Sequence, residues 1–245
     1  MRAQLVGDLD DPSVGKLFFK VASVGNANCT ATVINDSNSN PKESLVLTAA
    51  HCVEPAAMCI LLPFSHYMFA PEWTNNNPFP YGKWYPQSIY VPHNWLSKNS
   101  LGCWSENPKF DYAILIMRQQ KDATGVPRGV GYDTGENGWK YGMPARKNVR
   151  IVGIPGDDPK PLQVITESTT ITDCNVQNRT ASTPGFSSGS SGGPWFYSFN
   201  KSEQLGMLLG IVSGCNNGGP DDNTSYSAVW HADYGAFVDY VASKE

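Results

Sequence analysis

Short β-rich segments separated by turn residues constrain this 245-residue chain more than any other feature. Runs of Val, Ile, Thr and aromatic residues favour strands, and the Gly, Pro, Asn and Asp between them favour turns. Many short strands with little helical periodicity are typical of antiparallel sandwiches or barrels. The expected strands are residues 16–21, 29–34, 45–48, 60–62, 112–117, 149–153, 163–171, 195–199 and 208–212.

Helices are expected at only two places. Apolar residues recur at helical spacing near the C-terminus, which predicts a helix over residues 234–244. A second, short helix is expected to start after His51, directly behind an apolar strand. Residues 71–108 are expected to form an insertion that packs on the surface or rims a cleft, and residues 129–143 a connection between two lobes.

Composition excludes several classes of function. The net charge of −4 and the absence of a Lys/Arg cluster argue against nucleic acid as a partner. No apolar run approaches the roughly 20 residues that span a bilayer, so no membrane association is expected. No pattern indicates oligomerisation, and we expect a monomer.

The cysteines indicate an oxidising compartment. Six cysteines can form three disulfides, which together with the low charged content of 16% predicts a secreted, extracellular protein. Buried free thiols are the alternative. The N-terminus lacks the apolar core of a signal peptide, so we expect that a leader is removed. N-glycosylation sequons occur at Asn28, Asn35, Asn178, Asn200 and Asn223. They weakly favour a glycoprotein.

Residues 188–194 read Ser-Gly-Ser-Ser-Gly-Gly-Pro and predict a tight turn that presents a serine. A serine nucleophile needs a base, an acid that orients the base, and N–H groups aimed at the developing oxyanion. Flanking glycines let the backbone turn so that several N–H groups point one way. Ser191 is the expected nucleophile, with the amides of Gly189, Ser191 and Ser190 as oxyanion donors. By itself, such a Gly/Ser-rich segment is more often a plain loop.

Two further segments offer the base and the acid. His51 ends an apolar run and precedes Cys52, which could pin its backbone. Asp111 heads the apolar strand 112–117, where an unpaired carboxylate would be expensive to bury, so a partner is expected. A structural or exposed histidine and an exposed aspartate that caps the strand are the alternatives.

Together, residues 48–52, 111–115 and 189–194 resemble the three catalytic motifs of the chymotrypsin-like (trypsin-like) serine peptidases. The order His, Asp, Ser is that of this family and differs from subtilisins and α/β-hydrolases. Residues 15–19 and 80–84 look more like the secreted V8-like or glutamyl-endopeptidase-like branch. The resemblance also covers residues 29–34, 210–214 and 226–229, and thus nearly the whole chain.

This resemblance implies an all-β fold: two six-stranded antiparallel Greek-key β-barrels around a catalytic cleft, with a C-terminal α-helix. The N-terminal barrel would span residues 15–125 and the C-terminal barrel residues 145–233, in one peptidase domain. The implied activity is that of a serine endopeptidase with an acyl-enzyme intermediate and no metal or organic cofactor. Protein or peptide substrates and proteinaceous inhibitors are the implied partners.

The resemblance also implies disulfides and an activation route. Only Cys29–Cys52 follows the family pattern, and the remaining cysteines are expected to pair as Cys59–Cys103 and Cys174–Cys215. Vertebrate-type members carry Asp immediately before the nucleophile, where it receives the freed N-terminal ammonium. Ser190 occupies that position here, so a zymogen switch of this kind is not expected.

The same comparison addresses the specificity pocket. The position six residues before the nucleophile is Gly185 rather than an acid, which argues against cleavage after Lys or Arg. Val212 stands where glutamyl-specific relatives have a histidine, before Ser213. We therefore expect an uncharged P1 residue. The residues expected to bind substrate are Gly185, Phe186, Val212, Ser213, Gly214, Cys215 and Thr224.

Two other functions use the same residues. A protease-like binding module would have lost catalysis, although all three triad positions are filled here. An esterase on the same fold would use an identical triad. His66, His93 and His231 are interpreted as structural or surface residues, because none has ligand spacing to another His or Cys.

Overall fold

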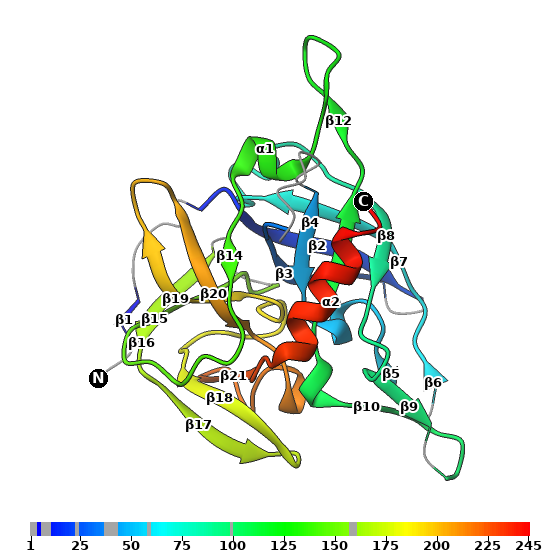
Figure 1. Cartoon of the computed structure of the whole chain (residues 1–245), viewed down its shortest axis with the longest axis vertical. Coiled ribbons are helices and arrows are strands. Elements are labelled where there is room, and N and C mark those ends of the chain that lie inside the picture. The colour runs from blue at the N-terminus through cyan, green and yellow to red at the C-terminus, as the bar shows by residue number, and fades with distance from the viewer. Residues whose placement is uncertain are drawn as a thin grey trace.

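The protein, seen in a computed structural model, folds into two β-barrels with a helix at the C-terminus (Figure 1). The structure describes residues 4–5, 11–22, 25–36, 44–57, 60–98, 100–156 and 161–245. The predicted fold class is therefore confirmed.

Six antiparallel strands form the sheet of the N-terminal barrel, in the order β7-β2-β3-β4-β11-β8. Every residue of β4 and β11 is buried, in keeping with their continuous apolar runs. The strands are β2 (Val14–Val21), β3 (Gly25–Val33), β4 (Leu45–Thr48), β7 (Phe64–Pro71), β8 (Pro86–Tyr90) and β11 (Ala113–Met117). Three small hairpins are appended: β5 (Ala56–Ala57) with β6 (Ile60–Leu61), β9 (Leu96–Lys98) with β10 (Trp104–Glu106), and β12 (Gln120–Lys121) with β13 (Pro127–Arg128).

The C-terminal barrel divides its strands between two sheets rather than one, which refines the predicted six-stranded barrel. Its strands pair antiparallel except β14, which runs parallel to β20. The first sheet comprises β1 (Gln4–Leu5), β16 (Leu162–Thr166), β15 (Val149–Gly153), β19 (Pro194–Asn200), β20 (Leu205–Ile211) and β14 (Gly138–Trp139). The second comprises β17 (Ser168–Asp173), β18 (Val176–Ser182) and β21 (Thr224–Ala228).

The helices are few and short. The C-terminal helix α2 (Ala232–Ala242) starts and ends slightly earlier than predicted. The short helix expected near His51 is a single 3₁₀ turn, η1 (Ala50–Cys52), which contains the histidine. The others are η2 (Pro108–Phe110), α1 (Val130–Thr134) and η3 (Cys215–Asn217).

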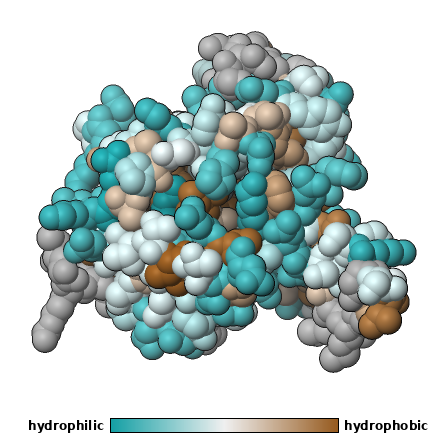
Figure 2. All heavy atoms as spheres, turned by 60° about the horizontal axis from the view of Figure 1, so that its bottom comes forward, coloured by the Kyte–Doolittle hydropathy of each residue, from teal (hydrophilic) through white to brown (hydrophobic). Residues whose placement is uncertain are grey.

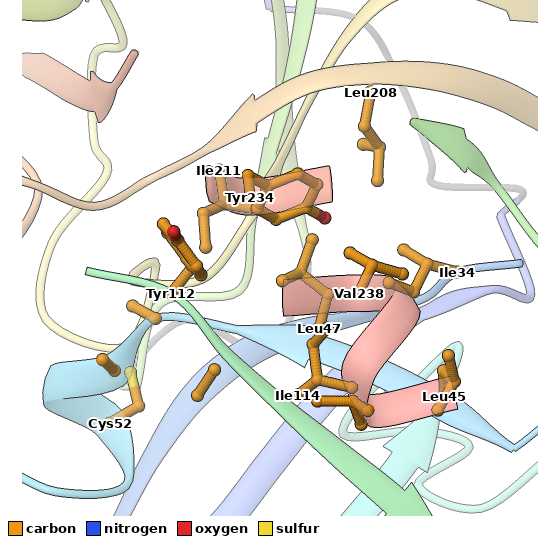
Figure 3. Close-up of a cluster of buried hydrophobic side chains, with 14 of the residues drawn as sticks. Ile34, Leu45, Leu47, Cys52, Tyr112, Ile114, Leu208, Ile211, Tyr234 and Val238 are labelled. Atoms are coloured by element: carbon orange, nitrogen blue, oxygen red, sulfur yellow. The ribbon is translucent and has the colours of Figure 1, made fainter. Parts of the chain in front are cut away.

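One hydrophobic cluster spans both barrels and the C-terminal helix. Figure 3 shows Tyr234 and Val238 of α2 near Leu47 and Ile114 of the first barrel and Ile211 of the second. Burial of such side chains is the dominant favourable term in folding. The cluster therefore holds the two barrels, and the ends of β4 and β11, in one arrangement.

A buried amide adds polar contacts between the barrels. Asn137 Nδ2 donates to Ser13 Oγ at 2.6 Å and to Thr32 Oγ1 at 3.1 Å. Asn137 Oδ1 accepts from the N–H of Gly206, on β20, at 2.8 Å. Because hydrogen bonds are directional, this residue sets the relative position of the barrels more specifically than apolar contacts do.

One face of the protein is mostly polar. On the face shown in Figure 2, hydrophobic residues form small, separate patches within a mainly hydrophilic surface. Within the described part of the chain, no helix combines the length and the apolarity needed to cross a bilayer.

Candidate active site

Two paired strands of the first barrel bring His51 and Asp111 together. β4 and β11 are antiparallel, and Thr48 at the end of β4 pairs with Ala113 at the start of β11. The chain leaves β4 through η1, which carries His51, and enters β11 just after Asp111. The predicted base and acid therefore meet at one end of the sheet.

The Asp111 carboxylate is fully buried and accepts hydrogen bonds from three N–H groups. His51 Nδ1 lies 2.8 Å from Asp111 Oδ2, and the backbone N–H of His51 donates to Oδ1 at 3.0 Å. The N–H of Gly214 donates to Oδ2 at 2.8 Å. These donors compensate the burial of the charge. With Nδ1 donating to the carboxylate, Nε2 of the neutral ring is the acceptor.

The imidazole of His51 is a stronger base than an exposed histidine. Its side chain is only 10% exposed. Burial lowers the pKa of His51, but the charge and hydrogen bond of Asp111 and the charge of Glu106 outweigh it, so the pKa is raised overall. Glu106 Oε1 itself accepts from the N–H of Ala56 at 2.7 Å. Glu106 was not predicted from the sequence.

The turn over residues 188–191 leaves two N–H groups available to a ligand. In a planar trans peptide the N–H points opposite to the C=O. The Ser188 C=O accepts from Gly156 N at 2.7 Å, and the Ser190 C=O accepts from Gly193 N at 3.0 Å. The N–H groups of Gly189 and Ser191 therefore point away from these partners, and neither has an acceptor among the described residues.

The third predicted oxyanion donor is used otherwise. The N–H of Ser190 donates to the Ser187 C=O at 3.1 Å, which corrects its expected role. Glycine is required at position 189, where φ is +103° and a Cβ would lie 2.5 Å from Asn28 Nδ2. The Ser190 side chain is 2% exposed, and its hydroxyl has no hydrogen-bond partner among the described residues.

The hydroxyl of Ser191 is bonded to a backbone carbonyl. Ser191 Oγ donates to the C=O of Asn217 at 3.2 Å. Among the described residues, no hydrogen bond joins Ser191 to His51. Asn217 belongs to η3, where it and Asn216 both have φ of +55°.

A cavity of about 260 Å³ opens beside Ser191. Of the residues expected to bind substrate, Phe186 and Val212 line it, and the other five do not. Gly214 instead contacts Asp111, and Ser213 Oγ accepts from Ala228 N at 3.4 Å. The remaining lining consists of Ser187, Ser188, Ser190, Ser191, Asn216, Asn217, Gly218, Gly219, Pro220, Asp221, Asp222 and Ser225.

Two disulfides brace the site, and both pair as expected. Cys29–Cys52 ties β3 to the residue after His51, and Cys174–Cys215 ties η3 to the turn between β17 and β18. Cys103 is also disulfide-bonded. Its expected partner, Cys59, lies outside the described residues.

Comparison with known protein families identifies the family of this chain. Residues 8–227 match the protein family described as "Lysyl endopeptidase, C-terminal domain". The chain belongs to this family. Membership in the lysyl endopeptidase C-terminal domain family, together with the fold, makes the protein a relative of serine proteases.

Solved structures show the same fold. This member of the lysyl endopeptidase C-terminal domain family is similar to the protease Anisep from Arthrobacter nicotinovorans, with a TM-score of 0.75, 21% identity, and 99% and 100% of the two chains covered. A thermostable serine protease, AL20, from an extremophilic microorganism matches with a TM-score of 0.73 and 19% identity. The match covers 97% of this chain and 100% of that protease. A Glu endopeptidase matches with a TM-score of 0.63 and 17% identity. The match covers 98% of this chain and 96% of the Glu endopeptidase chain. These matches confirm the predicted resemblance to chymotrypsin-like and V8-like peptidases.

The fold alone does not establish activity. An inactivated protease paralogue of the scabies mite also matches, with a TM-score of 0.58, 16% identity, and 98% of each chain covered. The comparison with curated proteins finds no match.

Proposed function

We propose that this protein is a serine endopeptidase in which Ser191 is the nucleophile, His51 the general base and Asp111 the residue that orients the base. The observation that carries the proposal is the buried Asp111 carboxylate, 2.8 Å from His51 Nδ1. The site also holds two backbone N–H groups that have no acceptor among the described residues. In acyl transfer, such a carboxylate keeps the imidazole in the tautomer that accepts a proton at Nε2.

In the proposed reaction, Ser191 Oγ leaves the Asn217 carbonyl and attacks the scissile carbonyl while His51 Nε2 takes its proton. The oxyanion binds to the N–H groups of Gly189 and Ser191. The C–N bond then breaks, and the imidazolium gives its proton to the leaving amine. In the second half, His51 Nε2 takes a proton from water while the water oxygen attacks the acyl carbonyl. The ester C–O bond then breaks, and the imidazolium returns the proton to Ser191 Oγ.

Labelling with a fluorophosphonate probe tests this function. The wild-type protein should become labelled at Ser191 and cleave a peptide substrate, and Ser191→Ala should lose both. Ser202→Ala, which removes an exposed hydroxyl between β19 and β20, should behave like the wild type. An unlabelled, correctly folded wild type would instead favour the protease-like binding module. Turnover of simple esters without peptides would favour an esterase.

The proposed P1 residue is uncharged. The buried side chains that line the cavity, those of Phe186, Ser190, Val212 and Ser225, carry no charge. The unpaired Ser190 hydroxyl offers a hydrogen bond to a polar P1 side chain. The two carboxylates, Asp221 and Asp222, are exposed, and Asp221 Oδ1 accepts from Asn223 N at 2.8 Å.

A peptide library that varies only P1 tests this specificity. We expect uncharged residues to be favoured and Asp or Glu to be rejected. Strong selection for Lys or Arg would contradict the proposal and would make Asp221 and Asp222 the determinants.

We also propose that the protein is secreted, monomeric and inhibited by proteins that occupy its cleft. Disulfides support the secretory route, since they persist in oxidising compartments. If it is a glycoprotein, Asn35, Asn200 and Asn223 are the exposed acceptors. Asn28 Nδ2 and the whole of Asn178 are buried, so these two sequons should remain unmodified.

A further inference from the structure

A second cavity, of about 510 Å³, lies over strands β2 and β3. Aromatic and aliphatic side chains of Phe18, Met68 and Trp73 contribute much of its lining. Asn28 and Gly156 also line it. We call this cavity the β2–β3 groove.

The groove adjoins the turn that carries the oxyanion donors. Gly156, which lines the groove, donates its N–H to the Ser188 C=O at 2.7 Å. Asn28, also in the lining, lies against Gly189, since a Cβ there would be 2.5 Å from its Nδ2. Thr30, two residues along β3, donates its N–H to the Ser191 C=O at 2.8 Å.

The cavity beside Ser191 borders the same turn but shares no lining residue with the groove. It is lined by Ser188, Ser190 and Ser191 but by no residue of β2 or β3. A peptide whose P1 side chain enters that cavity would continue past the scissile bond toward the β2–β3 groove. Gly156 and Asn28 line the groove and also lie against this turn, so the residues that follow the scissile bond would reach the groove.

We propose that the β2–β3 groove binds the leaving-group side of the substrate and selects a large apolar side chain two residues after the scissile bond, at P2′. This inference rests on the proposed endopeptidase function and names a further substrate preference of that site.

The floor of the groove is built to stay in place. The rings of Phe18 and Trp73 meet edge to face, with centroids 6.0 Å apart. The Lys16 ammonium lies 3.9 Å from the Trp73 ring centroid and donates to the carbonyls of Pro155 and Gly156, at 3.4 Å each. Lys16 is only 2% exposed, and its contacts join the aromatic floor to residues 155–156, which lie beside the turn. A preformed apolar floor favours a large apolar side chain because binding costs little reordering.

The charge of the rim adds a second selection. Lys20 is exposed, and among the described residues no carboxylate belongs to the lining. Strands β2 and β3 pair so that Phe18 lies opposite Asn28 and Lys20 lies opposite Asn26. Lys20 is therefore two residues farther along β2 than Phe18. A substrate Lys or Arg at P2′ would meet like charge and would be disfavoured.

The test uses internally quenched peptides that are identical except at P2′, which is Phe, Leu, Gly, Asp or Lys. We expect kcat/KM for Phe and Leu to exceed that for Gly and Lys by roughly tenfold, as for other apolar pockets. Phe18→Ala should remove the preference for Phe and Leu. Lys20→Glu, on the exposed rim, should reverse the order of Asp and Lys, and it carries the test if Phe18→Ala does not fold.

A peptidyl anilide, which has no residues after the scissile bond, is the control substrate. Both variants should cleave it at the wild-type rate, because the groove would be empty. Wild-type cleavage of all five peptides at equal rates would overturn this inference alone. A wild type that cleaves neither the peptides nor the anilide would overturn the proposed function itself.

Discussion

The two halves of the candidate active site are held in different ways. In the N-terminal half, the Asp111 carboxylate is fully buried, and three N–H donors surround it. In the C-terminal half, Ser191 sits on a glycine turn, and its hydroxyl bonds to the Asn217 carbonyl rather than to His51. The proposed base is thus already positioned, whereas the proposed nucleophile must rotate before it can react.

The difference has a structural origin. His51 and Asp111 lie at the ends of two paired, buried strands, where the sheet leaves little freedom. Ser191 and Asn217 lie on turns joined to the second barrel, with left-handed residues at Gly189, Gly192, Asn216 and Asn217. Strands give precise positions, whereas turns allow the backbone conformations that expose N–H groups.

The largest expected effect comes from breaking the rigid half. Asp111→Asn should lower kcat/KM by about 10⁴, because the amide can hold the imidazole in the wrong tautomer. The measurement is steady-state hydrolysis of a peptide substrate. Fluorophosphonate labelling should slow in parallel, while the circular dichroism spectrum stays that of the wild type. Near-normal turnover would show that Asp111 does not orient the base.

A smaller loss should follow from disturbing the glycine turn. In Gly189→Ala the new Cβ would lie 2.5 Å from Asn28 Nδ2 and 2.6 Å from Gly156 N, so the turn must shift. Loss of one oxyanion donor typically lowers kcat by 10²–10³-fold, and we expect this range, with KM little changed.

Gly125→Ala is the matched control for that variant. Gly125 also has a positive φ, of +84°, but its Cβ would meet nothing within 4 Å. It should therefore keep the activity of the wild type. Equal losses in both variants would attribute the effect to backbone strain rather than to the oxyanion donors.

A still smaller effect on activity is expected from opening the disulfide of the C-terminal half. Cys174 is exposed, whereas Cys29 and Cys52 are both buried, so mild reductant should open Cys174–Cys215 first. Replacing both Cys174 and Cys215 by Ala should lower the free energy of unfolding by about 2–4 kcal/mol. Activity should fall less than in Gly189→Ala and should no longer respond to reductant.

Peptide mapping after partial reduction checks the order of opening. If Cys29–Cys52 opened first, burial would not protect the disulfide of the N-terminal half from reductant better than that of the C-terminal half.

The smallest effect concerns the pH profile. The proposed mechanism needs neutral His51, so the acid limb of kcat/KM should report its pKa. Glu106 is one of the negative charges that raise the pKa of His51. Glu106→Gln removes this charge, so the limb should move to lower pH, with the plateau rate nearly unchanged. A limb that stayed in place or moved upward would show that Glu106 does not act on the base.

Strand prediction succeeded for continuous apolar runs such as residues 45–48 and missed several other strands, among them β7, β8 and β18. The strands 45–48 and 149–153 have their predicted bounds. The predicted strand 163–171 is two strands, since Glu167 separates β16 from β17. β18 was missed because its buried residues include Asn178 and Arg179, whose hydropathy indicates a surface loop.

The same contrast holds for the site. Local motifs indicated His51, Asp111 and Ser191, because each of these proposed triad residues stands in a distinctive sequence context. Most of the pocket lining could not be predicted, because residues 216–222 form an irregular loop with no periodicity to read.

By itself, the sequence determined which reactive side chains the chain offers and the order in which the proposed catalytic residues occur. Only the tertiary structure decided what each group contacts. The Gly214 N–H that reaches Asp111 lies 103 residues away from it in the chain, and the Asn217 carbonyl that holds Ser191 lies 26 residues away. The first contact depends on how the two barrels pack and the second on how two turns of the second barrel meet, and such directional hydrogen bonds have no local signature in the sequence.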